Sequence, residues 1–147
     1  MISLKRASRE DLPALERLEQ ESFSASDYPL SRANFLYHIK RENPLFLAYE
    51  EGWVLGYALG LLRPKSLRLY SLAVGIEYRH QGVGKRLLEG VMEEAMRLGK
   101  KEVTLEVRES NQRARILYEK AGFELWKRLE GYYPDGEAGV RLRKALS

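Results

Sequence analysis

The sequence predicts an α/β (α+β) fold in which a mixed central sheet of about six to seven strands carries helices on both faces. Two observations lead to this class. Apolar residues repeat at every second position in some segments and at helical spacing in others, and the two kinds of segment are interleaved along the chain. Turn-forming residues recur at short intervals, and no repeat, low-complexity tract or linker divides the 147 residues. We expect residues 1–147 to form a single domain with the order β-α-α-β-β-β-α-β-α-β-β.

The N-terminal part is predicted to contribute one strand and two helices. Residues 2–6 read as a short strand. Ser8 and Asp11 have the spacing of a capping box at the start of a helix over 9–20, whose leucines share one face. Residues 31–40 form a second helix with a weaker apolar pattern.

A hairpin and a third strand are predicted next. The apolar segments 45–49 and 53–62 flank Glu51-Gly52, which is typical of a turn between two paired strands. Arg63-Pro64-Lys65 ends the hairpin, and a strand over 67–74 then leads into a glycine-containing loop.

The remainder alternates helix and strand. The helix after the glycine loop is amphipathic and ends at Gly99. Residues 103–108 alternate like a half-buried strand, and Ser110 or Asn111 is placed to cap a helix that runs to about Ala121. The pattern predicts two final strands near 123–127 and 139–143.

Composition excludes several classes of site. The chain has no cysteine, and its two histidines, His38 and His80, are far apart in sequence, so we expect no metal cofactor. The N-terminus turns polar within a few residues, and no segment approaches the roughly eighteen uncharged apolar residues of a membrane helix. We therefore expect a cytoplasmic protein that does not bind membranes.

The net charge of +4 is unevenly placed. Residues 1–62 hold seven lysines and arginines against nine acids, whereas residues 63–147 hold eighteen against twelve. A basic half is compatible with nucleic acid, but these cations alternate with acids and form no run. We rank nucleic-acid binding last and expect no nucleic acid as a partner. A small polyanion bound by the second half fits the same charges.

The loop around Gly82 and Gly84 is the strongest candidate for a binding site. Neither glycine has a Cβ, so the backbone can approach an anion closely, and the free N–H groups of the next helix supply donors. Arg79, Lys85 and Arg86 add positive charge. The pattern fits neither a nucleotide P-loop nor a dinucleotide fingerprint, which indicates a different anionic ligand. The alternative is a tight turn without a ligand.

Four segments in order resemble the GNAT N-acetyltransferase superfamily, and within it the RimI-like protein N-terminal acetyltransferases. They are Leu72-Ala73-Val74, Arg79-His80-Gln81-Gly82-Val83-Gly84, Leu105-Glu106-Val107-Arg108 with Ser110-Asn111 and Leu117-Tyr118, and Gly131-Tyr132-Tyr133-Pro134-Asp135-Gly136-Glu137. The resemblance spans nearly the whole chain. It implies the GNAT fold and direct transfer of an acetyl group from acetyl-CoA to a primary amine.

The resemblance also implies where acetyl-CoA binds. The strand end at 72–74 corresponds to the segment that holds the pantetheine arm in that family, and the loop at 79–84 to the segment that binds the pyrophosphate. Asn111 corresponds to an asparagine that holds the cofactor, although it is also placed to cap a helix. The residues assigned to acetyl-CoA are Leu72, Ala73, Val74, Arg79, His80, Gln81, Gly82, Val83, Gly84, Lys85 and Asn111.

Glu106 and Tyr118 are the candidate catalytic residues. An α-amino group is partly neutral at physiological pH, so a carboxylate such as Glu106 suffices as base, directly or through a water. Glu106 shares a strand face with Thr104, and the alternative is a solvated strand carboxylate. Tyr118 is the candidate proton donor to the departing thiolate, with a core or rim aromatic as the alternative.

Tyrosines are the candidate acceptor-site residues. The resemblance places Tyr132 and Tyr133 near the acceptor, and we add Tyr28 from the opposite wall. Arg108 is expected to pair with a nearby carboxylate. Of the remaining aromatics, we expect Trp53 and Trp126 in the core and His80 to pack within its loop.

The sequence departs from the RimI-like pattern at two places. Gly75-Ile76 stands where many relatives have an Asp-Pro-like pair, and the segment 22–30 lacks the Trp-containing version of an acceptor-site wall. The expected acceptor is a protein N-terminus, with ribosomal proteins among the candidates, and lysine side chains and small amines stay open. A catalytically silent CoA-binding module is the alternative from another class. We expect a monomer or a weak homodimer.

Overall fold

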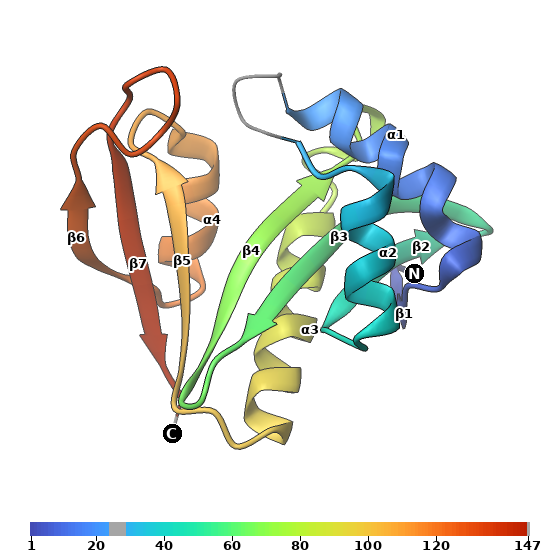
Figure 1. Ribbon diagram of the computed structural model, residues 1–147, viewed down its shortest axis with the longest axis horizontal. Coiled ribbons are helices and arrows are strands. Elements are labelled where there is room, and N and C mark those ends of the chain that lie inside the picture. Colours follow the sequence, from blue (N-terminus) through green and yellow to red (C-terminus); the bar gives the residue numbers. More distant parts are fainter. Residues whose placement is uncertain (24–28, 147) are drawn as a thin grey trace.

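The structure is a computed structural model that describes residues 1–23 and 29–146. The predicted acceptor residue Tyr28 therefore lies outside the described residues. Within the described ranges lie seven strands and four α-helices (Figure 1). They are β1 (Ser3–Arg6), α1 (Leu12–Ser22), α2 (Arg32–Lys40), β2 (Leu45–Glu50), β3 (Trp53–Leu62), β4 (Ser66–Val74), α3 (Val83–Arg97), β5 (Glu102–Arg108), α4 (Gln112–Lys120), β6 (Glu124–Leu129) and β7 (Gly139–Ala145).

The strands form one mixed sheet in the order β1-β2-β3-β4-β5-β7-β6. All neighbouring strands are antiparallel except β4 and β5, which are parallel and are connected through α3. This arrangement confirms the predicted fold class and element order.

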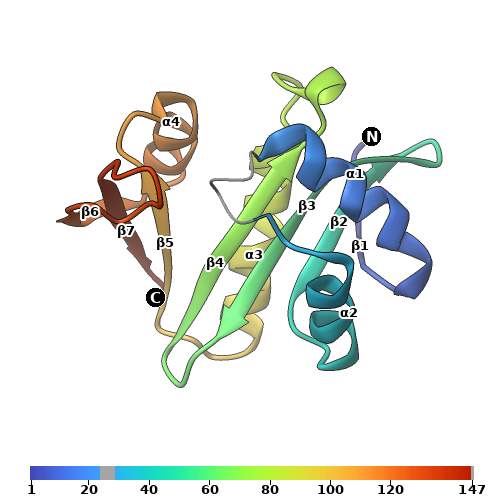
Figure 2. The same ribbon diagram turned by 45° about the horizontal axis from the view of Figure 1, so that its top comes forward.

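Helices cover both faces of the sheet, with α1 and α2 on one face and α3 and α4 on the other (Figures 1 and 2). Each face has its own apolar core. The leucines of α1 and Phe35 of α2 pack on Tyr57 and Leu59 of β3. Leu87, Leu88 and Val91 of α3 belong to the second cluster, which also includes Tyr118 of α4. Burial of these apolar stripes is the main term that stabilises the layers.

Local signals set the helix starts. Ser8 and Asp11 form the predicted capping box, but the residues Arg9–Asp11 are a 3₁₀ turn, and α1 begins at Leu12. Ser31 caps α2 by accepting a hydrogen bond from the Asn34 backbone N–H at 3.1 Å. Asn111 caps α4 by accepting one from the Ala114 N–H at 3.2 Å.

The sheet opens between β4 and β5, and this opening positions the site. The two strands pair only where Ser66–Leu69 face Glu102–Leu105. A register shift at Leu59 and Gly60 of β3 leaves Tyr70 of β4 bulged at the point where the pairing with β5 ends. Beyond it the strands diverge (Figure 1). The edge of β4 that faces β5 is therefore available to a ligand over its last residues.

The prediction that both tryptophans lie in the core is wrong. Trp53 is 65% exposed at the start of β3, directly after the turn at Glu51-Gly52. Trp126 is 42% exposed on the edge strand β6, where an irregularity in the pairing with β7 falls between Leu125 and Lys127. Its ring lies 4.7 Å from the Arg143 guanidinium carbon. A cation packed on the ring takes the place of core contacts.

Candidate active site

The glycine loop has the backbone conformation of an anion-binding turn. Gly82 is the N-cap of α3, with a left-handed φ of +82° that disfavours residues with a side chain. Gly84 faces α4, and a Cβ at this position would lie 3.3 Å from Leu117 Cδ2. The N–H groups of the first turn of α3 are open to a ligand beside Lys85.

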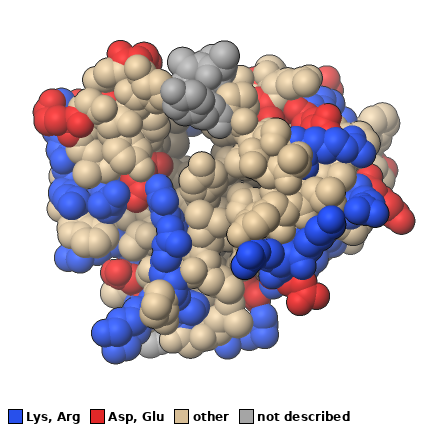
Figure 3. Space-filling view, in the orientation of Figure 1, with Lys and Arg blue, Asp and Glu red and all other residues tan. Residues whose placement is uncertain are grey.

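Two cavities meet in the opening of the sheet. The first, called the loop-side cavity, has a volume of about 590 Å³ and is lined by Leu72–Val74, the glycine loop and the start of α4. The second, called the strand-side cavity, has a volume of about 360 Å³ and is lined by residues of α1, β4, β5 and the β6–β7 loop. Both cavities share Ser22, Phe23, Leu72, Asn111, Ala114 and Tyr118. Figure 3 shows the hollow between the two halves of the molecule.

The predicted cofactor residues converge on the loop-side cavity with one exception. Leu72, Ala73, Val74, Arg79, His80, Gly82, Val83, Gly84, Lys85 and Asn111 all line it. Gln81 does not, because its amide turns back to donate to the Glu77 carbonyl at 3.3 Å. His80 has a left-handed φ of 66°, which turns the chain just before the loop.

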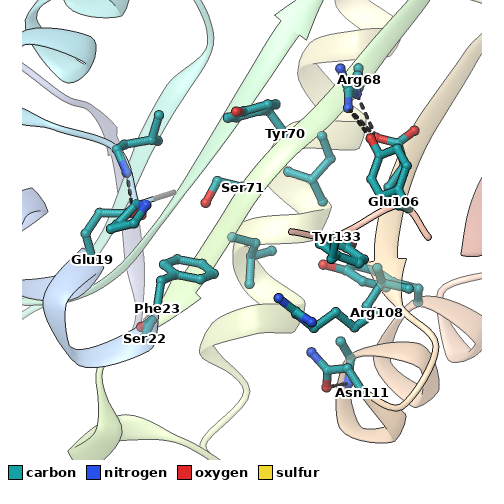
Figure 4. Close-up of a pocket in the computed structure, with 18 residues that line it drawn as sticks. Glu19, Ser22, Phe23, Arg68, Tyr70, Ser71, Glu106, Arg108, Asn111 and Tyr133 are labelled. Atoms are coloured by element: carbon teal, nitrogen blue, oxygen red, sulfur yellow. Dashed lines mark hydrogen bonds and ion pairs between the residues drawn. The ribbon is translucent and has the colours of Figure 1, made fainter. Parts of the chain in front are cut away.

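Glu106 lies in the strand-side cavity and is not a solvated surface carboxylate. Its side chain is 8% exposed, and it forms ion pairs with Arg68 and Arg141. Figure 4 shows the pair with Arg68. Arg68 Nε donates to Oε1 at 2.7 Å, and Arg141 Nε donates to Oε2 at 2.8 Å. Charge-assisted hydrogen bonds to both oxygens fix the orientation of the carboxylate.

Tyr118 lies where the two cavities meet. The residue is 8% exposed, and its ring packs edge-on against Phe123 with centroids 5.8 Å apart. Burial, and to a lesser degree Tyr133, raises the pKa of this phenol well above its ordinary value. The hydroxyl therefore stays protonated at physiological pH.

The β6–β7 loop forms the outer wall of the strand-side cavity. Tyr132 and Tyr133 both line it, with ring centroids 5.1 Å apart in an edge-on contact. Arg108 ties this loop to β5, because its Nη1 donates to Asp135 Oδ2 and Glu137 Oε1, both at 2.9 Å. The predicted pairing of Arg108 with a carboxylate is confirmed.

Sequence reasoning missed several polar residues of the strand-side cavity, among them Glu19, Arg68, Tyr70 and Ser71. Glu19 lies four residues after Leu15 and so falls on the apolar face of α1, which is the signal that reveals it. Arg68 and Ser71 carry no comparable signal, because the partner of a strand residue is set by the tertiary fold.

Within the described residues no group of three or more histidine, aspartate or glutamate side chains is placed to hold a metal ion. None of the described helices is long and apolar enough to cross a membrane.

The chain is similar to characterised acetyltransferases along most of its length. A model of the acetyltransferase (GNAT) family matches residues 11–123. The ribosomal protein bS18-alanine N-acetyltransferase of Escherichia coli strain K12 is 32% identical over 124 residues, 84% of this chain and 82% of that protein. The N-alpha-acetyltransferase of Saccharolobus solfataricus is 31% identical over 159 residues, 99% and 93% of the two proteins. The crystal structure of the ribosomal-protein-S18-alanine N-acetyltransferase from Escherichia coli has a TM-score of 0.89 and 29% identity, with 100% of this chain and 95% of that chain covered.

Proposed function

The chain belongs to the acetyltransferase (GNAT) family and is an acetyl-CoA-dependent N-acetyltransferase, and we propose that its acceptor is the α-amino group of a protein N-terminus. The observation that supports this acceptor most directly is the meeting of the two cavities at Tyr118. A cofactor in one cavity and a chain end in the other would meet where the cavities share lining residues, and Tyr118 is one of these. The names of two relatives, an alanine N-acetyltransferase and an N-alpha-acetyltransferase, describe the same acceptor class.

The loop-side cavity fits acetyl-CoA. The left-handed Gly82 and the N-terminus of α3 suit a pyrophosphate, and Lys85 adds charge beside it. A side chain at Gly84 would narrow the space between α3 and Leu117. We assign the pyrophosphate to this loop and the pantetheine arm to the free edge of β4 at Leu72–Val74, with Asn111 on the opposite side.

In the proposed chemistry, Glu106 faces the acceptor nitrogen and Tyr118 faces the leaving sulfur. Because each Glu106 oxygen already accepts from an arginine, the carboxylate is best placed to take a proton through an intervening water. Tyr118 supplies a proton to the departing thiolate. The amine attacks the thioester directly, so no acyl group is attached to the protein.

The acceptor is tested with two peptides and acetyl-CoA, by measuring CoA release. One peptide has a free alanine N-terminus and blocked lysines, and the other has a blocked N-terminus and one free lysine. We expect turnover on the first alone. Turnover only on the second would reassign the protein to lysine acetylation. If neither peptide is acetylated although acetyl-CoA binds, small amines become the next acceptors to test. If these also fail, the protein is a catalytically silent CoA-binding module.

The name of one relative gives ribosomal protein bS18 as its acceptor. We propose that this chain also acetylates a ribosomal protein, and that it does so in the cytoplasm. An intact ribosomal protein S18 as acceptor, compared with a peptide of its first residues, tests whether more than the chain end is recognised.

A further inference from the structure

A second glutamate lies in the wall of the strand-side cavity, on the side away from Glu106 (Figure 4). Glu19 of α1 is 3% exposed. Its Oε2 accepts from the Leu30 backbone N–H at 2.7 Å, and its Oε1 accepts from the Tyr57 hydroxyl. No lysine, arginine or histidine among the described residues forms an ion pair with it. A buried carboxyl without a cation is costly and calls for an explanation.

Tyr57 connects Glu19 to the cavity. The Tyr57 hydroxyl lies 2.7 Å from Ser71 Oγ, and Ser71 lines the strand-side cavity. Because Tyr57 donates its single proton to Glu19, Ser71 must donate to Tyr57. The lone pairs of Ser71 are then free to accept a hydrogen bond from a group in the cavity. The three side chains form a directed chain of hydrogen bonds that runs from the cavity to Glu19.

We propose that Glu19 is the proton acceptor that converts the bound ammonium form of the acceptor into the reactive amine, through Ser71 and Tyr57. An N–H bond of the ammonium group breaks as an O–H bond forms at Ser71. The Ser71 proton passes to Tyr57, and the Tyr57 proton passes to Glu19. One proton moves in total, Glu19 becomes a neutral carboxylic acid, and the amine gains its lone pair.

Acetylation of an ammonium group requires two deprotonations, which gives the two glutamates different tasks. The nitrogen loses one proton before attack and a second once the N–C bond has formed. Glu19 takes the first and Glu106 the second, while Tyr118 protonates the sulfur. Glu106 then returns its proton through water to the Tyr118 phenolate. After the product has left, Glu19 releases its proton to solvent through the open cavity. The balance is one proton released for each amide formed.

The environments of the two carboxylates support this division. Protonation of Glu106 would break a charge-assisted bond to Arg68 or Arg141. Glu19 has no such partner, and burial raises its pKa to about 7, close to that of an α-amino group. From α2, the apolar ring of Phe35 packs edge-on against Tyr57. The other titratable or charged side chains that line the same cavity are Arg68, Tyr70, Glu106, Arg108, Tyr118, Tyr132 and Tyr133.

The test compares kcat/KM of the wild type and Glu19→Gln from pH 6 to 9.5, with the alanine peptide and acetyl-CoA. Glutamine keeps the shape and a hydrogen-bond acceptor but cannot take the proton. We expect a deficit of about tenfold at pH 7, because an α-amino group with a pKa near 8 is neutral in only about one tenth of the peptide. The deficit should nearly vanish by pH 9, because the peptide amine is then mostly neutral without help. A deficit that does not change with pH would overturn the proposal, since a merely structural role predicts that result.

Matched variants separate the relay from folding effects. Tyr57→Phe breaks the chain while Glu19 remains, and should reproduce the pH-dependent deficit. Ser71→Ala should do the same, and Ser71→Thr should restore activity. Glu94→Gln removes another buried glutamate, which pairs with Arg6 and Arg97 outside both cavities, and should leave kcat/KM unchanged at every pH. Wild-type pH dependence in Tyr57→Phe would also refute the relay.

The inference rests on amine acetylation and not on the identity of the acceptor. If the lysine peptide is the one acetylated, the same comparison is made with it, and the deficit should persist to a higher pH because a lysine amine is more basic. Failure of the acceptor proposal therefore appears as a change of active peptide. Failure of the relay appears as a constant ratio between the variants.

Discussion

Glu19 and Glu106 line the same cavity but have different hydrogen-bond partners. Glu106 lies between two guanidinium groups, whereas Glu19 accepts only from a hydroxyl and a backbone N–H among the described residues. The first environment places cationic donors at both oxygens, and the second buries the carboxyl without a cation among the described residues. The roles proposed for them follow from the surroundings and not from the residue type.

Substitution of the two candidate catalytic side chains should slow turnover without loss of cofactor. We expect Glu106→Gln and Tyr118→Phe each to lower kcat by about 10² to 10⁴, the range of a general acid or base. Acetyl-CoA affinity, measured by calorimetry, should stay within about twofold, because neither side chain belongs to the glycine loop. Thr104→Ser, on the same face of β5, is the control. Wild-type kcat in both variants would remove the assigned roles.

Glu19 should also make stability depend on pH. Its pKa is raised from 4.5 to about 7 in the folded protein, so below pH 4.5 both folded and unfolded forms are protonated and there is no penalty. Between these values only the unfolded chain ionises, and the folded state loses up to about 3 kcal/mol above pH 7. Glu19→Gln removes this loss.

Urea unfolding at pH 4.5 and pH 8 measures that effect. The gain in unfolding free energy of Glu19→Gln over the wild type should be larger at pH 8 by at most about 3 kcal/mol. An equal difference at both values would show that the carboxyl titrates normally. A residue that lowers the stability of the folded protein at the pH at which the enzyme works is typical of a functional position.

At the scale of elements, the glycine loop can be tested against an ideal control within the same chain. Gly82 and Gly99 both have left-handed φ, +82° and +72°, and a Cβ would meet nothing within 4 Å at either. Gly82→Val and Gly99→Val should therefore lose similar stability, about 1 to 3 kcal/mol each. Only Gly82→Val should weaken acetyl-CoA binding, by about tenfold or more, since one lost anion contact is worth about 1.4 kcal/mol or more. Equal acetyl-CoA affinity in the two variants would contradict the pyrophosphate assignment.

The elements themselves were largely predictable, because hydrophobic periodicity and capping residues act locally. The strand predicted over 53–62 matches β3 (Trp53–Leu62), and the cap of α4 is Asn111, one of the two residues that the sequence offers. The start of α1 moved to Leu12 because the capping box closes a 3₁₀ turn first. Element order and the glycine loop could be read from the residues alone.

The polar interior of the site was not predictable to the same degree. Arg68 and Arg141 meet Glu106 from two neighbouring strands, 38 and 35 residues away in sequence. No local pattern encodes such a pairing. The exposure of Trp126 likewise depends on β6 being the last strand of the sheet, which is a property of topology.

On the scale of the whole molecule, the charge asymmetry of the sequence becomes a charged surface beside the site. Figure 3 shows lysine and arginine side chains over β5 and β7, on the face that α1 and α2 leave open. Arg141 and Arg143 belong to this face, as the register partners of Glu106 and Thr104. A peptide that leaves the strand-side cavity in this direction meets positive charge.

The effect of peptide charge on kcat/KM should therefore depend on the salt concentration. At about 50 mM salt, an alanine peptide with acidic residues after the N-terminus should have a higher kcat/KM than one with basic residues, and the difference should largely vanish at about 500 mM, where charges are screened within a few ångströms. A neutral peptide of the same length is the reference. A preference that persists unchanged at high salt would indicate contacts other than long-range attraction.

Sheet continuity between the two halves of the molecule depends on four residue pairs, Ser66–Leu69 with Glu102–Leu105. Both cavities open where this pairing ends, although the strand-side cavity reaches back to Arg68 and Leu69. We therefore expect a change in the angle between the halves to alter the width of both cavities. A ligand that favours one angle in its own cavity thereby changes the affinity of the other, and linkage requires the effect to be equal in both directions. We therefore expect the two substrates to bind cooperatively, with the short parallel pairing of β4 and β5 acting as the hinge.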